Sequence, residues 1–266
     1  MSKLILIILL FPTLVFADYE MAYDSYQKGD FDLAFTEFSQ LAKQENINAQ
    51  FYLGTMYRVG EGVNQDYVKS LDWYTKAAKS GEPRSQHNVA MFYQNGLGIE
   101  QDIIEAVYWY KLAALQDYVE SMRNLALIYY RGEEVSRNIP EAIRWWQKAA
   151  SLGAKGAQHN LGLMYFLGKG VEQDYDKAMQ WYLLSAKQGS KESQNSIGNM
   201  YFEGHGVEKD YLLAYVWFRL AEKNGMEIAG LNVGIIQANL STEELEVAEK
   251  LYDEFSQQYE GNTDLK

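Results

Sequence analysis

A period of 36 residues constrains this chain more than any other feature, because aromatic and glycine residues return at that spacing. Tryptophan recurs at Trp73, Trp109, Trp145, Trp181 and Trp217. Tyrosine and glycine keep the same spacing, at Tyr57, Tyr93, Tyr129, Tyr165 and Tyr201 and at Gly60, Gly96, Gly132, Gly168 and Gly204. Tandem units of this length cannot bury their apolar side chains alone and must stack on one another. The period predicts five copies, at 49-84, 85-120, 121-156, 157-192 and 193-228.

Each copy has the pattern of two helices joined by a glycine loop. In the fourth copy, Leu161, Met164 and Tyr165 mark one face of a first helix at helical spacing. Gly168 ends that helix, because glycine readily takes the left-handed conformation that follows a last turn. A second apolar run begins after Asp174, a residue type that caps helix N-termini. The other copies place Asp66, Asp102, Asn138 and Asp210 there. The sequence therefore predicts an all-α fold.

Small and large residues alternate along the predicted helices. Small residues recur at Gly54, Ala90, Ala126, Gly162 and Gly198 and at Ala77, Ala113, Ala149, Ser185 and Ala221. Small residues let helix backbones approach closely, whereas an indole buries about 150–250 Å². We therefore expect the five tryptophans to hold neighbouring helices together. The alternative is that they stack on sugars or bases, although a binding residue need not repeat at the same phase in every copy.

The run from Leu161 to Gly189 resembles the Sel1-like repeat, a relative of the tetratricopeptide repeat with a longer loop. Its residues follow the pattern LGxMYxxGxGVxxDYxKAxxWYxxAAxxG. The resemblance implies a right-handed α/α superhelical solenoid that binds protein partners without catalysis or a cofactor. This sequence departs from the pattern at Glu134, Asp117 and Asn138.

The two ends of the chain differ from the repeats. Residues 1-17 resemble a signal peptide, since Lys3 precedes a short apolar run and Ala17 precedes the expected cleavage site. We expect a capping helix pair at 18-48, which turns at Lys28-Gly29-Asp30. Two further capping helices are expected at 229-260, the second opened by a Ser241 to Glu244 capping box, before a tail at 261-266. The leader predicts a periplasmic or secreted protein with no membrane attachment in its mature form.

The charge and the amino-acid composition limit the classes of partner that this chain is expected to bind. The formal net charge is −12, and removal of Lys3 with the leader makes it one unit more negative. Such a surface repels nucleic acid phosphates and anionic lipid and favours a basic protein or peptide partner. Cysteine is absent, which excludes disulfides and thiolate chemistry. Oligomeric state does not follow from these features.

Catalytic and metal-binding motifs are weak in this sequence. His87 and His159 occupy the same position two copies apart, too distant for a shared metal, and His205 lies elsewhere. Ser25-Tyr26-Gln27-Lys28 matches the Ser-x-x-Lys of penicillin-binding enzymes but lacks that family's other motifs. A cell-wall or penicillin-binding enzyme or sensor of the Sel1-like family therefore stays an alternative, as does a scaffold for polysaccharide assembly.

Two rows of residues on the first helices are candidates for partner contact, because in helical repeats these helices usually line the concave face. One row holds Asn88, Asn124 and Asn160, flanked by Tyr52 and Ser196. Asparagine offers a donor and an acceptor, which suits an extended peptide backbone. The second row mixes polar and aromatic residues, a composition common at interfaces. It consists of Arg58, Gln94, Tyr130, Phe166 and Phe202. The alternative for both rows is local bonding or packing between copies.

Overall fold

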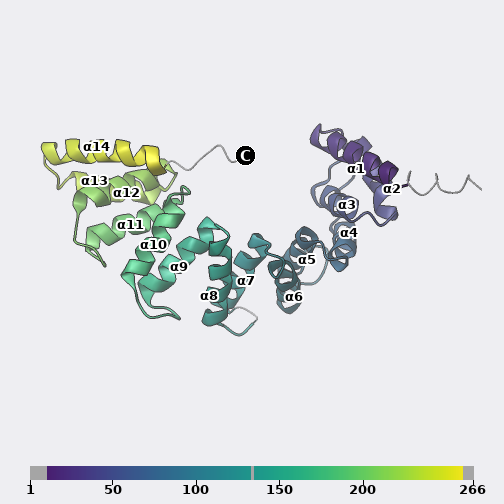
Figure 1. Cartoon of the computed structure of the whole chain (residues 1–266), viewed down its shortest axis with the longest axis horizontal. Coiled ribbons are helices and arrows are strands. Elements are labelled where there is room, and N and C mark those ends of the chain that lie inside the picture. Colours follow the sequence, from purple (N-terminus) through teal and green to yellow (C-terminus); the bar gives the residue numbers. More distant parts are fainter. Residues whose placement is uncertain (1–10, 133–134, 260–266) are drawn as a thin grey trace, which may run out of the picture. The chain divides into compact units, whose positions relative to one another are not determined.

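The computed structural model describes residues 11–132 and 135–259, with side chains from residue 19 onward. Within that part of the chain every regular element is a helix, which confirms the all-α prediction (Figure 1). The N-terminal helices are α1 (Phe11–Gln27), α2 (Phe31–Lys43), α3 (Ile47–Val59), α4 (Tyr67–Lys79), α5 (Pro83–Asn95), α6 (Ile103–Ala114) and α7 (Val119–Arg131). The remaining helices are α8 (Ile139–Ser151), α9 (Lys155–Leu167), α10 (Tyr175–Ala186), α11 (Lys191–Glu203), α12 (Tyr211–Lys223), α13 (Glu227–Gln237) and α14 (Thr242–Tyr259).

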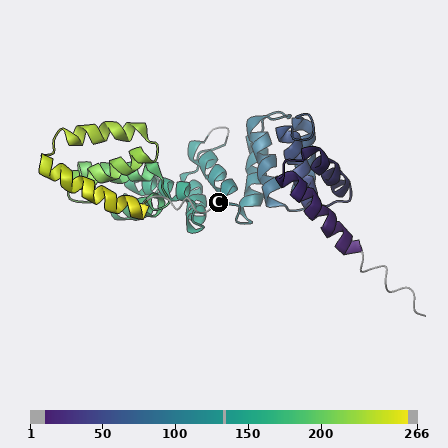
Figure 2. The same cartoon turned by 90° about the horizontal axis from the view of Figure 1, so that it is seen from above.

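The helices form two compact units, Met1–Leu125 and Ala126–Lys266. In the first unit, consecutive helices from α1 to α6 pack against each other in order. In the second unit the same holds from α8 to α13, and α14 packs back on α12. In Figure 2, α14 is the long yellow helix that lies against the green helices of the second unit. Sequential helix pairs are thus the building element of both units.

The predicted N-caps start the second helix of every repeat. Asp66 accepts a backbone hydrogen bond from Lys69 at 3.0 Å, and Asp174 accepts one from Lys177 at 2.9 Å. Asn138, the departure in the third copy, caps α8 in the same way by accepting from Glu141 at 3.1 Å. Asx side chains satisfy N–H groups that a helix start leaves without partners. The substitution of asparagine for aspartate therefore preserves the cap.

A positive φ angle follows each second helix of the repeats. Glycine supplies it in four copies, for example Gly189 at 73°, but Asp117 takes the same conformation with φ 64°. A non-glycine residue tolerates this region poorly, and aspartate is among those that enter it most readily. The second copy therefore keeps the turn despite the lost glycine. Glu134, the third departure, lies outside the described residues.

The aromatic residue after the tryptophan is buried in every repeat. These side chains are at most 1% exposed and comprise Tyr74, Tyr110, Trp146, Tyr182 and Phe218. In three copies a glycine of the first helix lies against this ring. A Cβ atom added to Gly162 would stand 2.5 Å from a ring carbon of Tyr182, and one on Gly198 would stand 2.7 Å from Phe218. The small residue thus sets how closely the two helices of a repeat approach.

Buried glutamines connect each first helix to the helix before it. Gln50, Gln86, Gln158 and Gln194 are at most 6% exposed. The side-chain Nε2 of Gln86 donates to the carbonyl of Ala78 at 3.1 Å, and Gln158 donates likewise to Ala150 at 3.3 Å. Each of these carbonyls also accepts from the backbone N–H of a turn glycine, Gly81 or Gly153, at 3.0 Å. The glutamine therefore supplies a second hydrogen bond to a carbonyl in the last turn of the preceding helix. The third copy has Met122 at this position, fully buried.

The two ends of the described chain carry the helices α1, α2, α13 and α14. At the N-terminus α1 and α2 form a pair, with Gly29 at φ 80° in the turn. Residues 1–10 of the predicted signal peptide lie outside the described part, and 11–17 belong to α1. At the C-terminus Ser241 and Glu244 form the predicted capping box, since Glu244 accepts from the Ser241 backbone at 2.8 Å. The predicted tail lies outside the described residues.

Two glycine substitutions test the close approach within a repeat. Gly162→Ala should destabilise the protein by about 1–3 kcal/mol, because the new methyl group overlaps the Tyr182 ring. Gly234→Ala in α13 is the matched control, since nothing lies within 4 Å of its added Cβ. Alanine there should stabilise the helix by about 0.5–1 kcal/mol. Urea unfolding measures both; equal effects of the two substitutions would contradict the role given to Gly162.

Candidate functional site

The asparagines of the first predicted row are half-buried on the first helices, and Asn124 forms a hydrogen bond with another side chain. Asn88 lies on α5, Asn124 on α7 and Asn160 on α9. The amide nitrogen of Asn124 donates to the hydroxyl of Tyr110 at 3.0 Å. Tyr110 in turn donates to Gln94 at 2.6 Å, so one residue from each predicted row meets at this hydroxyl. Burial raises the pKa of Tyr110 to about 12, which keeps that hydroxyl protonated.

Tyr52, which flanks the asparagine row, belongs to an aromatic cluster with the terminal cap. Its ring stacks on Phe38 with centroids 5.1 Å apart. It also contacts Tyr23 and Tyr26 of α1 at 5.5 and 5.3 Å. Burial raises the pKa of Tyr52 to about 12. The role of this ring in the structure is therefore to join the capping pair to the first repeat.

The second predicted row packs against residues of the following loop or helix. Arg58 donates through Nε to Tyr74 at 3.4 Å. Tyr130 accepts from Lys169 Nζ at 2.7 Å, and that ammonium also lies 4.3 Å from the Tyr130 ring centroid. Phe166 contacts His205 with centroids 5.4 Å apart. All are half-buried, so the alternative of packing between copies describes much of this row.

Phe202 completes the second row and contacts Tyr211 at 5.6 Å. Its equivalent in the fourth copy, Phe166, contacts Tyr175 in the same way at 5.3 Å. Each ring thus lies against the first residue of the second helix in its own repeat. Partner contact by these residues stays a prediction.

The tryptophans are not equivalent in their burial. Trp109, Trp145 and Trp217 are 8%, 4% and 2% exposed, whereas Trp73 and Trp181 are half-buried. The Nε1 of Trp109 donates to Glu105 at 2.9 Å within its own helix. Trp217 contacts Phe255 and Tyr259 of α14. The 36-residue period therefore does not determine how much of each indole is exposed to solvent.

Both histidines at the shared position bond to serines of the next first helix. His87 Nδ1 lies 2.9 Å from Ser121 Oγ, and His159 Nδ1 lies 3.0 Å from Ser193 Oγ. The two serines are fully buried. Burial lowers the pKa of His87 to about 4 and also lowers that of His159. These neutral rings connect successive first helices rather than forming a metal site.

Ser25 and Lys28 do not form a nucleophile and base. The Ser25 hydroxyl donates to the carbonyl of Met21 at 3.0 Å within α1, and the side chain is 7% exposed. Lys28 forms an exposed ion pair with Asp24 instead. A catalytic serine needs its hydroxyl within reach of a base and open to substrate. The Ser-x-x-Lys match is therefore a feature of the capping helix.

Residues 11–132 and 135–259 contain no group of three or more His, Asp or Glu side chains placed to hold a metal ion. In the same part of the chain, no helix combines the length and apolarity needed to cross a bilayer.

Two features were missed from the sequence, although both keep the 36-residue period. The aromatic residue after each tryptophan, which varies between Tyr, Trp and Phe, is part of the repeat pattern, but the main packing role was expected of the tryptophan. The glutamines recur at Gln50, Gln86, Gln158 and Gln194 and could have been found by that spacing. A polar residue that repeats in phase with apolar core positions is a candidate for a buried hydrogen bond.

Helix pairs joined by capped glycine loops and stacked through aromatic residues define a class, the α-helical tandem-repeat proteins. The Sel1 repeat model matches residues 47–82, 83–118, 119–153, 156–190 and 191–226. This chain belongs to the Sel1 repeat family. These repeats begin one or two residues before the copies predicted from the tryptophan spacing, close to the first residues of α3, α5, α7, α9 and α11.

Solved structures support the same assignment. A Sel1 repeat protein from Oxalobacter formigenes is 29% identical, with a TM-score of 0.74 over 88% of this chain and 98% of that one. A protective antigen of uropathogenic Escherichia coli strains, which displays an SLR fold, is 28% identical with a TM-score of 0.59. That similarity covers 92% of this chain and 61% of the antigen. No curated protein matches the chain.

The histidine–serine bonds predict a pH-dependent stability. The folded state keeps His87 neutral down to a pKa of about 4, whereas the unfolded chain protonates it near its ordinary value of 6.5. Stability should be fully present above pH 6.5 and fall as the pH decreases toward 4, by roughly 2–3 kcal/mol for this group. His87→Gln combined with His159→Gln should flatten the dependence measured by urea unfolding. His205→Gln is the control, and an unchanged slope in the double variant would contradict the assignment.

Proposed function

We propose that this chain is a non-catalytic scaffold that binds a partner protein or extended peptide along the first helices of its repeats. Sel1 repeat proteins are commonly protein-interaction scaffolds, which supports the general class. The observation that carries the proposal is the row of half-buried asparagines at one phase of α5, α7 and α9. Tyr110 holds the Asn124 amide through its nitrogen, so the amide oxygen can accept from a peptide N–H.

Charge favours a basic partner. Acidic residues outnumber basic ones by 36 to 24 across the chain. A surface of this sign attracts cationic segments over a range set by the ionic strength and repels nucleic acid. The binding should therefore weaken as salt is added, as expected for an association steered by charge.

The proposal is tested by affinity capture from a bacterial envelope fraction at low salt. Simultaneous replacement of Asn88, Asn124 and Asn160 by alanine should reduce the yield of the specific partner about tenfold. The Asn124 change should also cost roughly 1 kcal/mol of stability through the lost Tyr110 bond. The control replaces Gln147 and Gln180, exposed residues of second helices, by alanine. Unaltered capture by the asparagine variant, measured at a temperature where it is folded, would remove this row from consideration.

The proposed location rests on the apolar leader. We propose cleavage after Ala17 and a periplasmic or extracellular mature protein, since a charged start, an apolar run and a small residue precede Asp18. Cleavage there would leave the buried residues of α1, Ala22 and Ser25, in the mature chain. The truncated helix would thus still cap α2.

Mass spectrometry of the protein purified from its bacterial host should find Asp18 as the N-terminal residue. Ala17→Leu should block processing, because signal peptidase requires a small residue at that position. A mature protein that retains Met1 or the apolar run would contradict this location. Ala22→Gly, inside the mature chain, serves as a control that should leave processing unchanged.

A further inference from the structure

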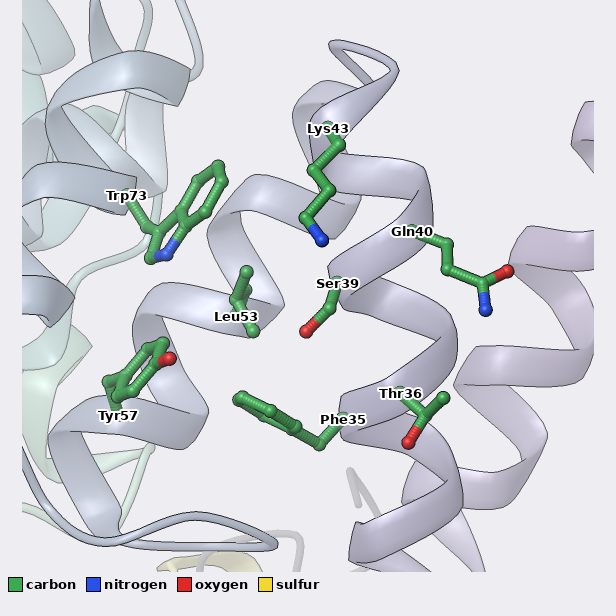
Figure 3. A pocket seen from close by; sticks show the side chains of 8 residues that line it. All are labelled: Phe35, Thr36, Ser39, Gln40, Lys43, Leu53, Tyr57 and Trp73. Carbon is green, nitrogen blue, oxygen red and sulfur yellow. The ribbon is translucent and has the colours of Figure 1, made fainter.

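A cavity of about 460 Å³ opens between α2 and α4 and over α3. Figure 3 shows the rings of Phe35, Tyr57 and Trp73 around it, with the polar ends of Ser39 and Lys43 turned toward the space. Thr36, Gln40 and Leu53 complete the lining. We call this cavity the Trp73 groove. It is an aromatic site with one lysine at its edge, and the predicted asparagine row does not contribute to it.

The same positions four repeats later are covered by the chain itself. Phe35, Ser39, Leu53, Tyr57 and Trp73 correspond there to Met179, Leu183, Ile197, Tyr201 and Trp217. Those five residues belong to a single core cluster that also contains Phe255 and Tyr259 of α14. The Tyr259 ring lies 4.8 Å from Trp217 and the Phe255 ring 5.6 Å from it, in edge-on geometry.

The equivalent indoles differ in exposure, although Trp109 and Trp145 are also buried without contact to α14. Trp217 is 2% exposed beneath the last turns of α14, whereas Trp73 is half-buried. An aromatic ring buries on the order of 150–250 Å², so covering the open groove would remove substantial apolar surface from water. The fold therefore contains its own example of the ligand that closes such a groove: a helix with two aromatic residues one turn apart.

The charges at the Trp73 groove suit an acidic helix. Lys43 stands at its edge, and the Lys76 ammonium lies 3.8 Å from the Trp73 ring centroid. At the covered groove the position of Lys76 is taken by Leu220, which is buried. α14 is itself acidic, with Glu254 directly before Phe255. The covered groove is basic as well, since Lys223 donates to Ser256 and Arg219 lies over the Tyr252 ring of α14. The lysines beside the open groove would likewise pair with carboxylates beside the two rings.

We propose that the Trp73 groove binds a short acidic helix of a partner protein that presents two aromatic side chains at positions i and i+4. The rings would lie against Trp73 and Tyr57, as Phe255 and Tyr259 lie in the equivalent groove. Carboxylates of the helix would face Lys43 and Lys76. This surface is additional to the asparagine row and does not depend on it.

The probe is a fluorescein-labelled peptide with the sequence of residues 242–259, and binding to the full chain is followed by fluorescence anisotropy. Ser39→Trp fills the groove and should weaken binding at least about tenfold. Gln147→Trp places the same side chain at the equivalent position three repeats later, on α8 and outside this groove, and should leave binding unchanged. Lys43→Glu should also weaken binding and reduce its salt dependence, with Lys111→Glu, at an exposed position of α6, as its control. Thermal unfolding confirms that each variant is folded.

Three results would overturn the proposal. The first is no saturable binding of the peptide, or equal binding of a peptide with alanine at the positions of Phe255 and Tyr259. The second is binding that survives Ser39→Trp, which would place the peptide elsewhere, for example at Trp217 by displacement of α14. The third is a homodimer in sedimentation that Ser39→Trp dissociates, which would make a second copy of this chain the occupant. None of these three readouts involves the asparagine row. The groove proposal can therefore fail while the proposed function stands, and the capture experiment can fail while the groove proposal stands.

Discussion

The contact between a small residue on one helix and an aromatic ring on the next is the constraint on which this fold depends. Gly54, Gly162 and Gly198 leave no room for a Cβ beside the rings of Tyr74, Tyr182 and Phe218. The distance between the two helices is therefore set by the ring thickness and by the missing side chain. Every ring is at most 1% exposed, so each also removes a large aromatic surface from water.

Polar bonds then determine how one repeat sits on the next within each unit. Gln86 and Gln158 donate to carbonyls at the ends of the preceding helices, and His87 and His159 meet buried serines of the following ones. Apolar contacts tolerate small displacements, whereas a buried hydrogen bond that is broken costs the desolvation of both groups. The aromatic contacts thus provide most of the burial, and the polar bonds fix the alignment of neighbouring repeats.

Periodicity and capping chemistry predicted the helices closely, because both depend on local sequence. The first helix of the fourth copy was expected from Ala157 and begins at Lys155, and Asp174 caps the next helix as expected. The side-chain partners of the predicted rows could not be derived in this way. The bond from Asn124 to Tyr110 joins residues of two helices whose relative rotation depends on packing, which the spacing of asparagines does not contain. The unequal burial of the tryptophans has the same origin.

The repeats at the two ends of the chain are not equivalent, and the grooves beside their tryptophans differ in their side chains. Trp73 and Trp217 occupy one phase of the repeat, yet α14 covers only the second. A solenoid repeat presents the same groove in each copy, and each groove must be closed by its own side chains, by a terminal helix or by another molecule. At Trp73 the groove has Ser39 where the covered groove has Leu183, and Lys76 where it has Leu220, so both positions offer polar groups in place of apolar ones. Such changes weaken self-closure and favour a separate acidic ligand, so terminal repeats are where this architecture can add a binding surface without disturbing the packing of the others.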